Sequence, residues 1–157
     1  MEKYLQSQQL FGMSFKMSIW FEPTTIEIIS ERSKNSMADF LGIKFTEITA
    51  NSITAIMPVS DKIKQPIGIV HGGANVVLAE TIASTAANYV IDLKKYFAVG
   101  LEINANHLRQ VREGVITAIT MPIHLGGKTQ VWSVDIFDDK GNKTCISRMT
   151  ACIVERK

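Results

Sequence analysis

One long apolar segment constrains the fold of this 157-residue chain more than any other feature. Between Lys64 and Asp92, Glu80 is the only Asp, Glu, Lys or Arg, and apolar residues surround it at helical spacing. A helix that is apolar on nearly every side is normally buried, so the segment predicts a central helix over residues 73–91. A carboxylate in that setting is costly unless it is paired. Glu80 is therefore either a hydrogen-bonded structural residue or a catalytic acid.

The rest of the chain predicts strands around this helix. Alternating apolar and polar residues indicate β-structure, and the short connections favour an antiparallel meander. These patterns predict an α+β fold in which a curved antiparallel sheet of five to six strands wraps around the long apolar helix. A further helix is expected from residue 23 to Lys34, capped by Thr24 or Thr25. The expected strands cover residues 41–46, 52–58, 99–106, 115–125, 130–137 and 144–154.

Length and composition indicate one globular domain over residues 18–157. Residues 1–17 follow no clear pattern and are interpreted as a poorly ordered N-terminal extension. The net charge of +2 does not indicate a nucleic-acid partner. The chain shows neither a membrane-spanning run nor a signal-peptide layout, so no membrane association is expected and the cytoplasm is the predicted location. Cys145 and Cys152 lie seven residues apart on one expected strand, hence on opposite faces and unpaired.

The start of the central helix is the second informative region. Gly72 and Gly73 follow His71 at the predicted helix start. Tandem glycines leave backbone N–H groups unobstructed at the positive end of the helix dipole, where the oxygen of a polarised carbonyl could bind. A tight loop that needs glycine for its dihedral angles explains the same residues, and the residues alone leave both interpretations open.

Three motifs in order along the chain resemble a known family. They lie in residues 65–84 (QPIGIVHGGANVVLAETIAS), 100–109 (GLEINANHLR) and 124–132 (HLGGKTQVW). Over about residues 40–156 the chain resembles the hotdog-fold acyl-CoA thioesterases, in the branch with the phenylacetyl-CoA and 4-hydroxybenzoyl-CoA enzymes. Within it, the likeness is greatest to bacterial 1,4-dihydroxy-2-naphthoyl-CoA thioesterases of menaquinone biosynthesis and to relatives that proofread siderophore assembly.

The resemblance implies a role for each matching residue. Glu80 would be the nucleophile or the general base, and the Gly72 amide would bind the thioester oxygen. Gln65 and His71 would flank the thioester, and Ser84 would help to place the attacking water. The implied reaction converts an aromatic acyl-CoA to the free acid, with no cofactor beyond the coenzyme A of substrate and product. The residues implied for coenzyme A binding are Asn106, His107, Arg109, His124, Gly126, Gly127, Lys128 and Thr129.

Helix geometry adds a constraint on assembly. Glu80 lies eight residues beyond Gly72, so about 12 Å separates them at about 1.5 Å per residue. One thioester carbonyl cannot contact both residues of the same chain. A homodimer with two shared sites is therefore expected, because a two-fold axis can bring Glu80 of a second copy to Gly72. The resemblance implies further assembly into a homotetramer.

Other functions remain as alternatives at this point. A dehydratase or hydratase on the same fold would also use a His and a carboxylate, to move a proton beside the acyl β-carbon. A non-catalytic acyl-CoA-binding regulator would keep the pocket without the chemistry. The spacing of the three histidines argues against a metal site. Residues 126–129 lack the first glycine of a phosphate-binding P-loop and precede a strand rather than a helix.

Overall fold

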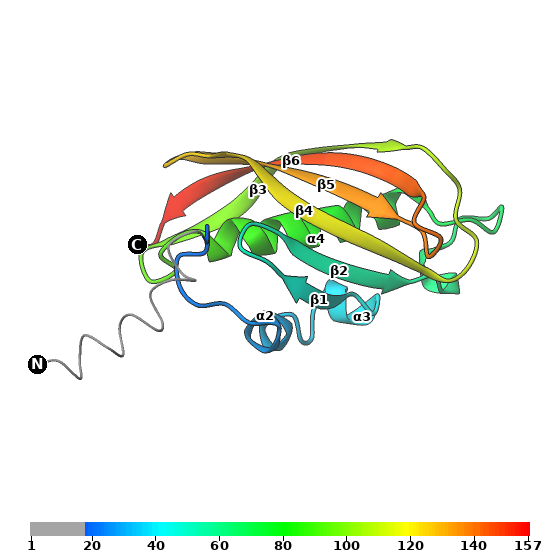
Figure 1. The fold of residues 1–157 in the computed structure, drawn as a ribbon, viewed down its shortest axis with the longest axis horizontal. Coiled ribbons are helices and arrows are strands. Elements are labelled where there is room, and N and C mark those ends of the chain that lie inside the picture. Colours follow the sequence, from blue (N-terminus) through cyan, green and yellow to red (C-terminus); the bar gives the residue numbers. More distant parts are fainter. Residues whose placement is uncertain (1–17) are drawn as a thin grey trace, which may run out of the picture.

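Six antiparallel strands form one sheet that curves around a long helix in the computed structural model, which describes residues 18–157 (Figure 1). The prediction of a curved antiparallel sheet around a central helix is confirmed, whereas the interpretation of residues 1–17 lies outside the described residues. The helices are α2 (Ile26–Arg32), α3 (Met37–Phe40), the 3₁₀ turn η1 (Asp61–Ile63) and α4 (Gly72–Tyr89). The strands are β1 (Lys44–Ile48), β2 (Ile53–Pro58), β3 (Tyr96–His107), β4 (Val115–Leu125), β5 (Thr129–Phe137) and β6 (Lys143–Glu155).

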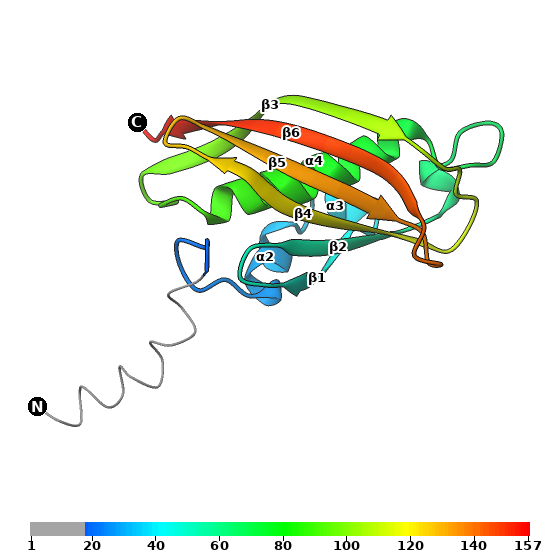
Figure 2. The same ribbon diagram turned by 45° about the horizontal axis from the view of Figure 1, so that its top comes forward.

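The strand order is β1-β2-β4-β5-β6-β3, so the predicted meander is only partly right. Strands β4, β5 and β6 do follow one another across the sheet. Strand β3 does not pair with β4, its successor in the chain, but lies at the far edge against β6. The cause is α4, which crosses the concave face between β2 and β3 and carries the chain to the opposite edge (Figure 2). Strands β1 and β3 are therefore the two edges.

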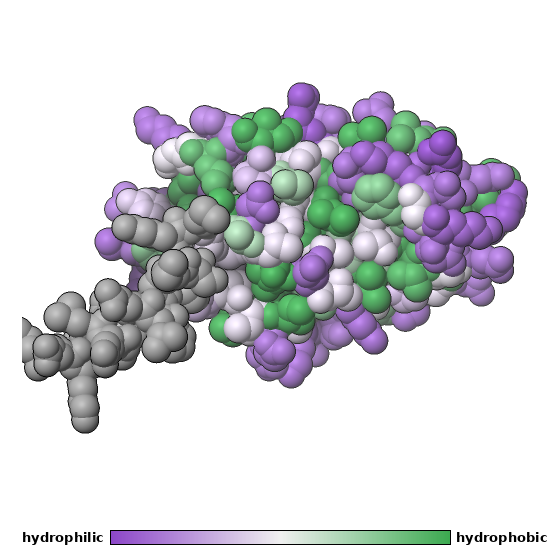
Figure 3. Space-filling view, in the orientation of Figure 1, coloured by the Kyte–Doolittle hydropathy of each residue, from purple (hydrophilic) through white to green (hydrophobic). Residues whose placement is uncertain are grey.

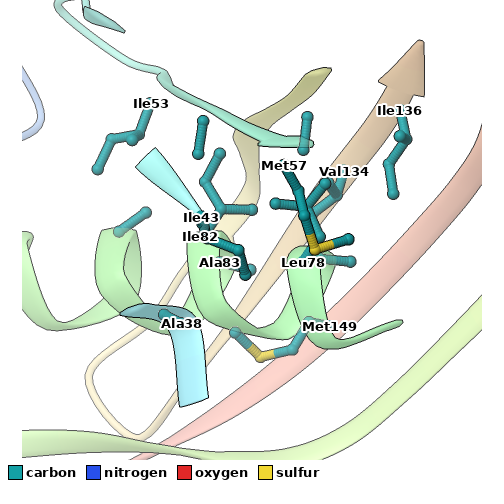
Figure 4. Close-up of a cluster of buried hydrophobic side chains, with 14 of the residues drawn as sticks. Ala38, Ile43, Ile53, Met57, Leu78, Ile82, Ala83, Val134, Ile136 and Met149 are labelled. Atoms are coloured by element: carbon teal, nitrogen blue, oxygen red, sulfur yellow. The ribbon is translucent and has the colours of Figure 1, made fainter. Parts of the chain in front are cut away.

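The core lies between α4 and the concave face of the sheet. Leu78, Ile82 and Ala86 follow one another at intervals of four residues on α4 and are fully buried. They pack in the same apolar cluster as buried strand residues such as Val134 and Met149 (Figure 4). Burying each large aliphatic side chain contributes roughly 1.5–3 kcal/mol. The predicted burial of the central helix is confirmed.

Local signals explain most element boundaries. Thr25 caps α2, as one of the two predicted caps, by accepting a hydrogen bond from the Ile28 N–H. The short helix α3 was not predicted, although Ser36 caps it by accepting from the Asp39 N–H. Because α3 runs into Gly42, which has a φ of 73°, the first strand begins at Lys44 and not near residue 41.

The edge strand β3 has two irregular features beside α4. Its register against β6 shifts between Gly100 and Glu102, which leaves a β-bulge there. The second feature is at Ala98, two residues before Gly100. The Asn88 side chain, on α4, accepts from the Ala98 N–H and donates to the Ala98 carbonyl. These hydrogen bonds connect the last turn of α4 to the edge strand and fix the position of β3 along the helix axis. Among the described residues, no helix is both long and apolar enough to span a bilayer.

Candidate active site

The first turn of α4 presents backbone donors. His71 is the N-cap, and its Nδ1 accepts a hydrogen bond from the Gly73 N–H at 2.8 Å. Within the part of the chain that the structure describes, the Gly72 N–H has no hydrogen-bond partner. A free N–H at the start of an 18-residue helix lies at the positive end of the helix dipole and can bind an oxygen that carries negative charge.

His107, the last residue of β3, lies directly against this turn. A Cβ atom added to Gly72 would be 2.7 Å from His107 Nε2, so any side chain at this position would require the ring to move. The other ring nitrogen, Nδ1, lies 3.2 Å from Nδ2 of Asn75 on α4. His107 was predicted to contact coenzyme A. The structure places it beside Gly72 and next to Arg109, where it can contact the thioester end of the substrate as well.

A hollow of about 260 Å³ opens beside these groups. It brings together Gln65, Gly72, His107 and Arg109, which lie far apart in the sequence. The loop before α4 places Gln65 there by a turn in which the Gly68 N–H donates to the Gln65 carbonyl and Gly68 has a φ of 77°. Four predicted site residues therefore line one surface at the start of α4.

Glu80 lies half-buried in the middle of α4 and is paired within the chain. Ser84, one turn later, donates from Oγ to Glu80 Oε1 at 3.0 Å. Ser84 was predicted to help to place the attacking water; the structure shows its direct hydrogen bond to Glu80, and its part in holding water stays a prediction. Across from them, a Cβ on Gly100 of β3 would overlap Glu80 Oε1. The carboxylate consequently lies against the backbone of the edge strand, beside its β-bulge.

The predicted coenzyme A residues fall into two groups. Arg109, with exposed Asn106 nearby, lies at the start of α4, and its Nη1 donates to the Lys143 carbonyl at 2.8 Å. The turn between β4 and β5 lies at the opposite end of the helix (Figures 1 and 2). There, Gly126 and Gly127 share an apolar hollow of about 540 Å³ with Val90 and Ile91. One chain does not bring the two groups together.

Within that turn, the side chains differ in what constrains them. His124 folds over Gly126, since a Cβ there would be 2.6 Å from His124 Nε2. Gly127 has open space around it, and Lys128 and Thr129 are exposed. The Lys128 carbonyl accepts from the Ile153 N–H, and the exposed side chain forms no ion pair among the described residues. A glycine turn beside a free ammonium group suits a phosphate.

Comparison with known proteins identifies the family of this chain. The model of the thioesterase superfamily matches residues 67–145. A 1,4-dihydroxy-2-naphthoyl-CoA hydrolase of Escherichia coli is 45% identical over 136 residues, which cover 87% of this chain and 99% of the relative. A proofreading thioesterase of Cronobacter sakazakii is 37% identical, with 87% and 98% covered. The crystal structure of a mutant thioesterase from Pseudomonas aeruginosa superposes with a TM-score of 0.87 at 43% identity, covering 88% of this chain and all of that one.

The chain belongs to the thioesterase superfamily. Its fold is the hotdog fold, and the enzyme is a thioester hydrolase. The chain of this thioesterase spans nearly the whole length of the relatives named above, and the matched residues include the α4 start, Glu80 and the whole of β3.

Sequence reasoning missed three residues that shape the site of this thioesterase. Gly100 leaves room for the Glu80 carboxylate, Asn88 ties α4 to β3, and Asn75 bonds His107. The two asparagines could have been noticed as polar residues in an apolar helix. Gly100 gave a weaker signal, because a glycine inside a strand indicates a bulge or a close approach without naming the partner.

Two further properties bear on the chemistry. Among residues 18–157, no three His, Cys, Asp or Glu side chains are grouped so that they could hold a metal ion. The two cysteines are free and lie on opposite faces of β6, with Cys145 buried and Cys152 half-buried. Burial raises the pKa of the Cys145 thiol, which keeps it in the unreactive thiol form at neutral pH.

Proposed function

We propose that this thioesterase hydrolyses an aromatic acyl-CoA to the free acid and coenzyme A. The observation that carries the proposal is the pair of complementary half-sites in one chain: a free Gly72 N–H at the start of α4 and a Glu80–Ser84 pair in its middle. The naphthoyl-CoA hydrolase at 45% identity supports an aromatic acyl group, and menaquinone biosynthesis is the proposed context.

The reaction needs an attacking oxygen and a site for negative charge. The thioester oxygen binds the Gly72 N–H, with Gln65 and His71 beside the thioester. As general base, Glu80 takes a proton from water, whose oxygen attacks the carbonyl carbon. The C–S bond then breaks, and the proton passes to the departing thiolate. As nucleophile, Glu80 would attack the carbonyl carbon and expel the coenzyme A thiolate, which takes a proton from water; the resulting anhydride with the acyl group is then hydrolysed by water, which restores the carboxylate. An N–H donor to the oxyanion contributes about 3–4 kcal/mol in comparable sites.

Both residues act on one carbonyl only if two copies of the chain share the site. Strand β3 is a 12-residue edge whose outer hydrogen-bonding groups are unpaired beyond Ala98 in the described chain. It exposes Val99 and Leu101, the latter to 64%. Pairing this edge with its two-fold copy would satisfy the free backbone groups and reduce the exposure of both side chains. Glu80 of α4 lies against Gly100, which belongs to this edge strand, so the Glu80 carboxylate would lie at that interface.

The same arrangement accounts for the two separated groups of coenzyme A residues. Suppose that the α4 helices of two copies run antiparallel, with Glu80 of the second copy beside Gly72 of the first. The part of the second helix that follows Glu80 then extends beyond the start of the first helix. The glycine turn lies beside Val90, ten residues beyond Glu80 and about 15 Å along the helix. The glycine turn of the second copy would then lie beyond Gly72 of the first copy, on the side where Arg109 of the first copy lies. We propose that residues 124–129 of one chain and Arg109 of the other hold the nucleotide end of coenzyme A.

A homotetramer is the proposed assembly. The outer, convex face of the sheet exposes Met121 and Ile123 on β4 and Ile146 on β6. Figure 3 shows apolar residues interspersed with polar ones over one face of the molecule. Packing of two dimers through these sheet faces would remove the apolar side chains from water.

Incubation of the purified protein with benzoyl-CoA and a thiol reagent tests the activity on aromatic substrates. Release of free thiol at a rate proportional to enzyme is expected. With an α,β-unsaturated acyl-CoA in place of benzoyl-CoA, loss of enoyl absorbance without thiol release would indicate a hydratase. Binding of both substrates without either change would indicate a regulator. A panel of naphthoyl, benzoyl, phenylacetyl and fatty acyl thioesters then ranks the acyl groups by kcat/KM, with an aromatic group expected first.

A further inference from the structure

Asn75 is a buried polar residue that the proposed mechanism does not use. It is the fourth residue of α4, only 6% exposed, and lies between the core residues Ala74 and Leu78. Burying an amide is costly unless its polar groups are paired. Its Nδ2 lies 3.2 Å from His107 Nδ1, and its Oδ1 has no partner among the described residues. A half-paired amide in the core lowers stability, so its single bond to His107 calls for a functional explanation.

The contact determines which nitrogen of His107 carries the proton. In the structure the amide nitrogen of Asn75 faces the ring, and because this nitrogen can only donate, His107 Nδ1 accepts in this arrangement. A neutral imidazole that accepts at Nδ1 carries its proton on Nε2. We infer that Asn75 is a positioning residue, which holds the neutral His107 in the Nε2–H form and turns that N–H toward the start of α4.

The position of Nε2 gives this form a consequence for substrate binding. Nε2 lies so close to Gly72 that a Cβ there would be only 2.7 Å away, and the Gly72 N–H beside it is also free. Two N–H donors at the start of α4, one from Gly72 of the helix and one from the His107 ring at the end of β3, suit an oxygen acceptor that gains negative charge in the transition state. This step rests on the proposed function: His107 would be the second donor to the thioester oxygen, beside Gly72.

The other ionisable groups near His107 do not supply this constraint. His71 at the N-cap already accepts from the Gly73 N–H through its own Nδ1. Arg109 donates to the Lys143 carbonyl. Cys145 lies opposite His107 in the β3–β6 ladder. In the described part of the chain, Asn75 is the only residue that is hydrogen-bonded to the His107 ring.

The first test is the protonation of the ring in the unmodified protein. The chain has three histidines, so long-range ¹H–¹⁵N spectra of ¹⁵N-histidine-labelled protein at pH 8 resolve each ring, with a His107→Gln spectrum giving the assignment. We expect an unprotonated Nδ1 and a protonated Nε2 in His107. A proton on Nδ1 would overturn the inference, and this result does not depend on whether any Asn75 variant folds.

The second test reverses the polarity of the contact. Asn75→Asp replaces a donor by an acceptor, so the proton should move to Nδ1. Asn75→Leu removes the contact at similar volume and should give a mixture of both forms. Asn106→Asp is the charge control: it adds a carboxylate one residue away from His107 without reaching Nδ1, and Nε2–H should persist. An unchanged ring in a folded Asn75→Asp protein would contradict the positioning role.

Kinetics separate positioning from structural support. If Nε2–H donates to the transition-state oxygen, Asn75→Asp should lower kcat for an acyl-CoA by at least about tenfold with little change in KM. In the Asn75→Leu protein, part of the His107 rings still carry the proton on Nε2, so kcat should fall less than in Asn75→Asp. If the proton of His107 moves to Nδ1 in Asn75→Asp while kcat stays at the wild-type value, His107 is not a donor to the thioester oxygen. Absence of hydrolysis in the wild-type protein would instead contradict the proposed function and leave the spectroscopic result intact.

Discussion

At the scale of single residues, Glu80 combines a half-buried carboxylate with one Ser84 hydrogen bond. Glu80→Gln keeps the shape and the bond from Ser84 but removes the charge. We expect turnover of an acyl-CoA to fall by at least about a hundredfold, as for loss of a positioned base. The melting temperature should stay the same or rise, because a costly partly buried charge is gone. Near-normal turnover in folded Glu80→Gln protein would exclude Glu80 from the mechanism.

Gly100 provides an independent check on the place of that carboxylate. Gly100→Ala puts a Cβ where Glu80 Oε1 lies, so the carboxylate must move. We expect a loss of turnover that comes close to that of Glu80→Gln. The Gly100→Ala, Glu80→Gln double variant should be no slower than Glu80→Gln alone, because both changes act on one group. Additive losses in kcat would mean that Gly100 matters for another reason.

Arg109 tests the proposed coenzyme A site. Arg109→Ala should raise KM by a similar factor for every acyl-CoA, because the nucleotide is common to all of them. With a short thioester that lacks the nucleotide, the increase in KM should largely vanish. Arg109 also donates to the Lys143 carbonyl, so the melting temperature of the variant must be measured first. An equal penalty with both substrate types would place Arg109 away from the nucleotide.

At the scale of elements, the turn between β5 and β6 is held by Asp138. Its carboxylate accepts from the Asn142 side chain and from the Lys140 and Asn142 N–H groups, and the Asn142 bond is the main cause of its lowered pKa. The folded state thus favours the charged form. This stabilisation is present above the unfolded pKa of an Asp and is lost as the pH falls through the lower, folded pKa.

Asp138→Ala should therefore lower the thermal midpoint at pH 7, and the difference from wild type should shrink as the pH is lowered toward 2. Asp139→Ala is the matched control, since no hydrogen bond to the Asp139 side chain is found in the described residues. It should change the midpoint less than Asp138→Ala at pH 7. A midpoint difference for Asp138→Ala that grows on acidification would contradict the role of this turn.

Most elements could be predicted from the sequence because their causes are local. The apolar periodicity of α4, the alternation in β4 and the Thr25 cap each lie within a few residues. The place of β3 at the far edge could not be predicted, because it depends on where α4 crosses the sheet. In the site, Glu80 and the glycines at the start of α4 stood out from their neighbours. The contact of Gly100 with Glu80 and the contact of Asn75 with His107 join distant segments, so they became visible only in the folded chain.

At the scale of the whole molecule, one chain contains both halves of the proposed site but keeps them apart. Gly72, Gln65 and His107 lie at the start of α4. Glu80 lies about 12 Å further along the helix, and Ser84 follows it by one turn. The unpaired β3 edge beside Glu80 provides the surface through which a second copy could complete each site. Catalysis would then require assembly, and the isolated chain would bind or hydrolyse little acyl-CoA.

Subunit mixing tests this shared site most directly. Glu80→Gln inactivates one half-site. Gly72→Pro removes the proposed N–H donor from the other and crowds His107, at a helix position that tolerates proline. Each variant should be inactive alone. After joint unfolding and refolding in equal amounts, half of the dimers should be mixed, each with one intact and one doubly altered site.

Circular dichroism and differently tagged chains establish that both variants fold and that mixed dimers form. The shared site then predicts that about a quarter of wild-type acyl-CoA hydrolysis returns, since half of the dimers regain one of their two sites. If mixed dimers form and no hydrolysis returns, Glu80 and Gly72 do not act together across the interface, and the shared-site mechanism is wrong.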